Sequence, residues 1–220
     1  MGQMIEFARP DGGSTGGYLA QAGSDRPGVI VLQEWWGLND QICGVADRFA
    51  RAGYNALAPD LYEGRVAQNP DEADHMMTGL DFPGATHQDI RGGALHLNSV
   101  GNGRVAVMGF CMGGALTIAA AVHVPECNVA VCYYGIPPKD FADASAIKVP
   151  FQGHFATKDD WCTPEAVEAL GADMAAGGVD HKIYSYEAEH AFANEVSDAY
   201  DVASARNSWT RMSEFLAARL

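Results

Sequence analysis

Basic residues are scarce in this chain of 220 residues. It contains 14 Lys and Arg against 28 Asp and Glu, which gives a formal net charge of −14. Such a surface repels nucleic acids and anionic lipids, so neither is expected as a partner. Uninterrupted apolar runs are also short. None approaches the roughly 18 residues that a membrane-spanning helix needs, so no membrane span is expected.

Cysteine is present, but in a pattern that excludes its commonest structural uses. The five cysteines are odd in number, form no C-x-x-C pair and have no histidines around them at zinc spacing. We therefore expect neither a disulfide framework nor a bound metal. The N-terminal stretch MGQMIEFARPDGGS lacks the basic and apolar regions of a signal peptide, so we expect a cytoplasmic protein.

What the chain does contain is an alternation of buried strands and helices. Strands at 28–33, 54–60, 104–108, 129–135, 149–155 and 181–187 alternate with helices at 40–52, 85–100, 113–122, 164–176 and about 199–219. Residues 4–7 and 16–20 form an opening hairpin, and residues 61–84 form a surface excursion without a clear period. This order predicts an α/β fold, with a mostly parallel central sheet and helices on both faces. Because no repeat or linker interrupts it, residues 1–220 are expected to form one domain.

Cys111 lies among glycines in the stretch MGFCMGGA, directly between a predicted strand and a predicted helix. A nucleophile on such a sharp turn needs small neighbours, which Gly109, Gly113 and Gly114 provide, because strand and helix approach closely there. The positive end of the following helix is expected to lower the pKa of the thiol. The backbone N–H of Met112 is expected to bind an oxyanion. The alternative is a buried cysteine in an ordinary strand-to-helix turn.

A cysteine nucleophile requires a general base and an acid that orients this base. In α/β-hydrolase sheets these follow in the order nucleophile, acid, histidine. Of the four later histidines, His190 follows the last predicted strand, where its loop reaches the carboxyl edge of the sheet. The other three lie at a helix end, within a strand and at a strand start, where solvated or structural roles are expected. Asp159, after the preceding strand, is the expected acid, and its neighbour Asp160 is the alternative.

Glu34 ends the first buried strand and is followed by two tryptophans. This place predicts that its carboxylate lines a pocket at the carboxyl edge and that the N–H of Trp35 is the second oxyanion donor. A capping or surface role is the alternative for Glu34. Further aromatic side chains are candidates for the pocket wall, with packing in the core as the alternative for each. They are Trp36, Tyr134, Trp161 and Phe192.

Six segments make the chain similar to the dienelactone hydrolase family of α/β-hydrolases. They are VLQEWWGLN, APDLY, VAVMGFCMGGAL, VCYYG, HFATKDDW and YEAEHAFA, in the family's order and at similar spacing over nearly the whole chain. The resemblance implies a cofactor-free enzyme that opens an enol-lactone such as dienelactone, giving maleylacetate in chloroaromatic breakdown. It also implies that Cys111, Asp159 and His190 form a catalytic triad. Glu34 would interact with the thiol and help to ionise it once substrate binds.

Two positions depart from the family members that act on dienelactone, in which arginines hold the substrate carboxylate. Asn194 stands where one arginine is expected. The stretch NPDEADHMM, after DLY, contains no arginine, and His75 is its nearest cationic candidate. Asparagine cannot replace the charge of an arginine, so the resemblance predicts the chemistry more firmly than the substrate.

Three functions remain open on the sequence. The first is opening of a dienelactone-like enol-lactone by the Cys–His–Asp triad. The second, which the missing arginines favour, is hydrolysis of other small esters or thioesters by the same triad. The third is a non-hydrolytic thiol protein that senses oxidants or binds a ligand. In each case the partner is a small molecule, and the chain is expected to act as a monomer or small homo-oligomer.

Overall fold

A sheet of eight strands forms the centre of the computed structural model, which describes residues 1–220. The strands are β1 (Gln3–Ala8), β2 (Ser14–Ala20), β3 (Gly28–Leu32), β4 (Asn55–Pro59), β5 (Val105–Phe110), β6 (Cys127–Tyr133), β7 (Phe151–Lys158) and β8 (His181–Glu189). Across the sheet their order is β1-β2-β4-β3-β5-β6-β7-β8. The pairs β1–β2 and β2–β4 are antiparallel, and all the others are parallel. The predicted mostly parallel sheet is confirmed.

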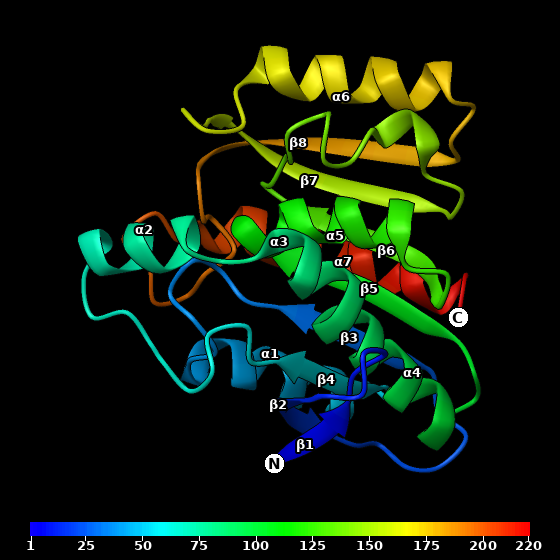
Figure 1. Cartoon of the computed structure of the whole chain (residues 1–220). Helices are drawn as coiled ribbons and strands as arrows, with labels where there is room; N and C mark the ends of the chain where they lie inside the picture. Colours follow the sequence, from blue (N-terminus) through cyan, green and yellow to red (C-terminus); the bar gives the residue numbers. More distant parts are fainter.

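Helices cover both faces of this sheet (Figure 1). Helices α1 (Asp40–Arg51) and α7 (Val202–Ala217) pack on one face, while α4 (Arg91–Val100), α5 (Met112–His123) and α6 (Pro164–Ala176) pack on the other. Along β3, Val29 and Val31 join the α1–α7 side, whereas Ile30 and Leu32 join the α4–α5 side. Both faces of the strand are therefore buried, which explains its continuous apolar run.

The segment 61–84 differs from its prediction because it contains helix α2 (Pro70–Thr78) and the single turn α3 (Phe82–Gly84). Helix α2 starts after Asn69, whose side chain accepts a hydrogen bond from a first-turn N–H. Only Ala73 and Met76 of this helix are buried, so it offers too few apolar positions for a visible period. The predicted helix 85–100 is present, but its first six residues form a π-helical segment before α4 begins.

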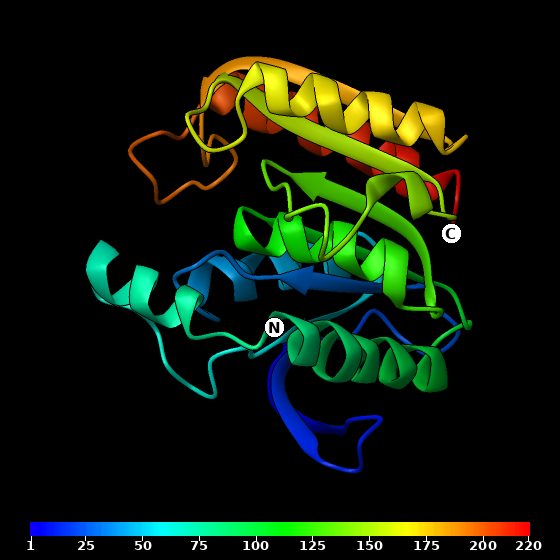
Figure 2. The same ribbon diagram turned by 45° about the horizontal axis from the view of Figure 1, so that its top comes forward.

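The carboxyl ends of the parallel strands meet at one edge of the sheet. In Figure 2 the arrowheads of β3 and β6 point towards the side on which α2 (cyan) and the loop after β8 (orange) lie. Segments that are distant in sequence therefore converge at this edge, which is where ligand sites of open parallel sheets are found. None of the helices combines the length and the apolar character required to span a bilayer.

Candidate active site

Cys111 forms the turn between β5 and α5, with φ 55° and ψ −117°. A positive φ is uncommon outside glycine and costs on the order of 1–3 kcal/mol, so the surrounding structure must hold it. The Cys111 N–H donates to the Tyr133 carbonyl at 3.0 Å, and the Ala115 N–H donates to the Cys111 carbonyl at 3.1 Å. These bonds fix the turn from both sides and leave the thiol half-buried at the carboxyl edge of the sheet.

Close backbone approaches explain the glycines around this turn. A Cβ on Gly109 would lie 2.3 Å from the Gly113 carbonyl oxygen, which no real Cβ tolerates. A Cβ on Gly114 would lie equally close, 2.3 Å, to the carbonyl oxygen of Tyr133. Gly135, just after β6, belongs to the same arrangement, because its Cβ would lie 2.2 Å from the carbonyl oxygen of Cys111. The glycines near Cys111 thus make the tight turn possible, and Gly135, which follows another strand, provides the space on its other side.

His190 follows β8 and lies beside the Cys111 thiol, with which it interacts. On the other side of the ring, Nδ1 is 2.7 Å from Oδ2 of Asp159. The Asp159 carboxylate is buried, and its Oδ1 accepts two backbone N–H groups of the following turn at 2.8 and 2.9 Å. Asp160 is exposed and makes none of these contacts. Of the two adjacent carboxylates, the structure brings only Asp159 to the histidine.

Burial raises the pKa of the Cys111 thiol, and the neighbouring charge of Glu34 raises it further. Contacts with His190 and with the N–H of Met112 oppose this shift without reversing it. The N–H of Met112, at the start of helix α5, lowers the thiol pKa in the predicted direction, but desolvation of a thiolate outweighs it, so the pKa is raised overall. Burial and the charge of Glu34 thus favour the neutral form of the thiol.

Asp159 stabilises the positive charge that His190 acquires when it takes up a proton. Burial alone would lower the pKa of His190, but its interactions with Asp159 and Cys111 raise it overall. Burial opposes ionisation of Asp159 as well, yet hydrogen bonds from His190 and from two backbone N–H groups lower its pKa. The imidazole is thus held as a strong base, in one orientation, beside the thiol.

Glu34 is buried at the end of β3, and both of its oxygens are bonded. Oε2 accepts a hydrogen bond from the Asn194 side chain at 2.7 Å, and Oε1 accepts one from the Tyr134 hydroxyl at 3.4 Å. Burial raises the pKa of Glu34, and these bonds offset the rise only in part. No hydrogen bond joins Glu34 to Cys111, so the two groups interact through charge alone. Asn194 serves here to hold Glu34.

Two adjoining cavities open beside the thiol, and Cys111, Trp161 and His190 line both. The larger measures about 360 Å³ and has mainly apolar walls. They include Met77 and Phe82 from the α2–α3 segment, Met112 and Tyr134 beside the thiol, and Ile136, Pro137, Pro138 and Phe141 from the loop after β6. An apolar cavity with a few convergent polar groups is the usual form of a small-molecule site.

The smaller cavity, of about 220 Å³, contains Glu34, Asn194 and the paired indoles of Trp35 and Trp36. The Trp35 ring contacts the Trp36 and Trp161 rings at centroid distances of 5.3 and 5.8 Å. The backbone N–H of Trp35 donates no hydrogen bond within the chain, so it is available to a ligand. Neither cavity is lined by arginine or lysine.

Comparisons with known proteins agree with this architecture. Residues 15–220 match the model of the dienelactone hydrolase family. The chain belongs to this family. It is 36% identical to "Protein usf" of Aquifex pyrophilus, covering 95% of both chains. It is 33% identical to the "Putative carboxymethylenebutenolidase" of Aquifex aeolicus, again covering 95% of both. The crystal structure of a "Putative Dienelactone Hydrolase" from Klebsiella pneumoniae superimposes with a TM-score of 0.87 at 27% identity, over 99% of both chains.

Within this dienelactone hydrolase family fold, two predicted pocket residues lie elsewhere. His75 is exposed on α2 and lines neither cavity, while Met77 of the same helix lines the larger one. Phe192 is buried in the core, with its ring 5.3 Å from the Tyr134 ring and 4.9 Å from the Tyr186 ring. Both corrections have the same cause: the direction of a side chain depends on how its segment packs, which the sequence does not show.

Sequence reasoning missed the contribution of the α2–α3 segment to this hydrolase cavity. A local pattern could have revealed part of it, because Asn69 followed by Pro70 is typical of a helix cap and first helical residue. Given that start, Ala73, Met76 and Met77 fall on one face of the helix. That this face meets the thiol follows only from the tertiary structure.

Proposed function

We propose that this chain hydrolyses a lactone or ester bond in a small uncharged substrate. Cys111 is the nucleophile, His190 the general base and Asp159 the acid that orients the histidine. The observation that carries the proposal is the 2.7 Å bond between His190 Nδ1 and Asp159 Oδ2, made by an imidazole that faces a thiol on a strained turn. This arrangement supports acyl transfer, in which a base must reach the nucleophile in a fixed tautomer.

In the first half of the reaction, Cys111 Sγ attacks the carbonyl carbon while its proton passes to His190 Nε2. The tetrahedral oxyanion receives the N–H groups of Met112 and Trp35. When the intermediate collapses, the bond to the leaving oxygen breaks and His190 returns the proton to that oxygen. In a lactone the leaving group stays tethered to the acyl group. The product of this half is a thioester on Cys111.

In the second half, His190 removes a proton from water, and the resulting hydroxide attacks the thioester. Sulfur leaves and takes the proton back from the imidazole, so the carboxylic acid is released and the neutral thiol is restored. Glu34 favours this resting state, because its charge raises the pKa of the thiol. A thiol that ionises only during attack is protected from oxidants between turnovers.

The walls of the cavities favour an uncharged substrate. A carboxylate-bearing lactone such as dienelactone would find no arginine or lysine in either cavity. The nearest polar groups are Glu34 and Asn194, and the first of these repels an anion. Hydrolysis of a neutral lactone or ester is therefore the best-supported reaction, and dienelactone hydrolysis, which the names of the relatives suggest, is the second candidate.

Intact-mass spectrometry during turnover tests the mechanism. The wild type, the Cys111→Ala variant and the control Cys43→Ala are mixed with 4-nitrophenyl acetate, dihydrocoumarin or dienelactone. Cys43 is a second half-buried free thiol that lines neither cavity, so its loss should change nothing. We expect an acyl adduct on the wild type and on Cys43→Ala only. We also expect kcat/KM to fall by at least about 10³ in Cys111→Ala.

Undiminished hydrolysis by Cys111→Ala would contradict the nucleophile assignment. Faster turnover of dienelactone than of the neutral lactone would instead overturn the substrate class and leave the triad intact. The alternative of an oxidant-sensing thiol has less support, since a sensor requires a low thiol pKa and burial raises that of Cys111.

A further inference from the structure

A second groove lies on the α1–α7 face of the molecule, away from the thiol. It measures about 490 Å³, and one face each of α1 and α7 forms its two sides. Residues 44, 45, 48 and 51 recur at helical spacing on α1, and residues 202, 205, 206 and 209 do so on α7. The groove shares no lining residue with either cavity of the candidate active site.

Three arginines line this groove, although the chain carries twice as many acidic as basic residues. Arg48 and Arg51 come from α1 and Arg206 comes from α7, and none of them has a carboxylate within ion-pair distance. Arginine at the C-terminal end of a helix is favoured by the helix dipole, which accounts for the two on α1. It does not account for Arg206, in the first half of α7.

Glu195 is the one acidic side chain in the lining, so the groove keeps an excess of two positive charges. Its carboxylate also accepts a hydrogen bond from the Gln41 side chain at 3.4 Å. Unpaired arginines in a concave site attract anions, and their planar guanidinium groups match the two oxygens of a carboxylate.

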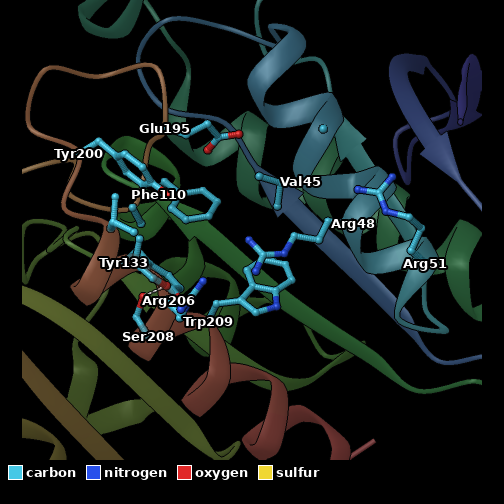
Figure 3. A pocket seen from close by; sticks show the side chains of 14 residues that line it. Val45, Arg48, Arg51, Phe110, Tyr133, Glu195, Tyr200, Arg206, Ser208 and Trp209 are labelled. Carbon is cyan, nitrogen blue, oxygen red and sulfur yellow. Dashed lines mark hydrogen bonds between the residues drawn. The ribbon is translucent and has the colours of Figure 1, made fainter.

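Aromatic rings form the rest of the groove. The Arg48 guanidinium stacks on the Trp209 indole, 3.5 Å from the ring centroid, and Figure 3 shows the two side by side. Phe110 and Tyr133 line the groove with their ring centroids 4.9 Å apart, and Tyr200 is exposed beside them. These flat apolar surfaces favour a ligand that carries a ring.

We propose that the α1–α7 groove binds a small aromatic carboxylate at a site separate from the Cys111 cavities. Arginines of the groove bind its carboxylate, and the accessible rings of Trp209 and Tyr200 contact its ring. Consecutive residues line the two sites, because Phe110 precedes Cys111 and Tyr133 precedes Tyr134. This proposal does not depend on the reaction catalysed at the thiol.

Fluorine NMR of protein labelled with 5-fluorotryptophan tests the proposal, since the four tryptophans divide between the two sites. Trp209 lies in the groove, while Trp35, Trp36 and Trp161 line the active-site cavities. Benzoate is the probe, and benzamide is its uncharged counterpart. We expect benzoate to shift the Trp209 resonance, assigned with Trp209→Phe, in a saturable manner and to leave the other three unchanged. Benzamide should have no effect.

Arginine variants provide the matched comparison. Arg51→Gln and Arg206→Gln should each weaken benzoate binding about tenfold, the usual effect of losing one charge-assisted hydrogen bond. Arg26→Gln is the control, because Arg26 is also exposed and free of ion pairs but lies outside the groove. The proposal is overturned if Trp209 does not respond, if benzamide shifts it equally, or if only the active-site tryptophans move. It is also overturned if Arg26→Gln weakens binding as much as Arg206→Gln.

Discussion

The protonation state of Cys111 is the residue-level property that most distinguishes this site. A helix end and an imidazole both favour thiolate, but burial and the charge of Glu34 favour the neutral thiol, and the second pair prevails. Glu34 can act in this way because Asn194 and Tyr134 hold its carboxylate in the interior. Glu34 thus influences the pKa of the sulfur from a position that Asn194 and Tyr134 fix.

The variant Glu34→Gln tests this balance. It keeps an oxygen that can accept the Asn194 bond but removes the charge that raises the thiol pKa. We expect the pH profile of alkylation by iodoacetamide to move to lower pH, with alkylation of Cys111 several-fold faster at pH 7.5. Glu187→Gln, at an exposed carboxylate on β8 paired only with Lys158, should retain the wild-type profile. An unchanged profile in Glu34→Gln would show that this charge does not act on the sulfur.

The neighbouring carboxylates Asp159 and Asp160 provide a second matched pair. Asp159→Asn removes the charge bonded to His190 Nδ1, and a triad that loses its orienting carboxylate typically loses about 10³–10⁴ in kcat. Asp160→Asn changes an exposed side chain and should leave kcat within about twofold. Steady-state kinetics with a neutral ester would measure both. Equal losses in the two variants would refute the assignment of the acid.

At the scale of elements, β7 illustrates how one strand serves both stability and the site. Asp159 follows its carboxyl end, while His154 lies in its buried middle. His154 Nδ1 is 2.8 Å from the Tyr186 hydroxyl, and its Nε2 is 2.9 Å from Oε1 of Gln152. These bonds satisfy a neutral imidazole, and burial, together with the charge of Arg211, lowers the pKa of His154 to about 3.

This shift predicts acid sensitivity of the fold. An unfolded histidine titrates near pH 6.5, so below that pH the unfolded chain binds a proton that the folded chain does not. Stability from His154 is thus complete above pH 6.5 and lost as the pH falls towards 3. We expect His154 to account for a drop of about 2–3 kcal/mol in the unfolding free energy between pH 7 and pH 4.5, measured by urea denaturation. His154→Gln should lose this share of the drop, whereas His181→Gln, at the partly exposed start of β8, should keep it.

At the scale of the whole molecule, the net charge and the lining of the cavities both disfavour anionic substrates. The net charge of −14 repels anions at long range, and the cavities beside Cys111 offer no arginine or lysine to hold one. The three unpaired arginines of the α1–α7 groove line neither of these cavities.

Two esters of similar size test this effect, namely 4-nitrophenyl valerate and its anionic counterpart, mono-4-nitrophenyl succinate. We expect kcat/KM at low salt to favour the neutral ester by about tenfold or more. Adding NaCl should narrow this gap, because it screens the repulsion of the anion over a Debye length of about 10 Å at 0.1 M. If salt instead slowed hydrolysis of the anionic ester, an attractive cation would have to lie near the site.

The sequence predicts the buried strands and the turn at residue 111 well, and it predicts the surface helix α2 poorly. Strands buried on both faces and the glycines around Cys111 leave strong local patterns, so the α/β sheet and the turn at residue 111 are visible in advance. Helix α2 is not, because few of its residues are buried. The choice of His190 among four histidines rests on its place after the last strand, and the structure brings it to Asp159.

Local order and spacing in the chain by themselves determined the alternation of strands and helices and the tight turn that carries the thiol. Each of these leaves a pattern among residues a few positions apart. Only the tertiary structure decided that burial raises the pKa of the thiol, that Asn194 holds Glu34, and that His75 and Phe192 lie outside the cavity. Desolvation and side-chain direction depend on segments that lie far apart in the sequence, as Glu34 and Asn194 do at 160 positions, and no local pattern records how they pack.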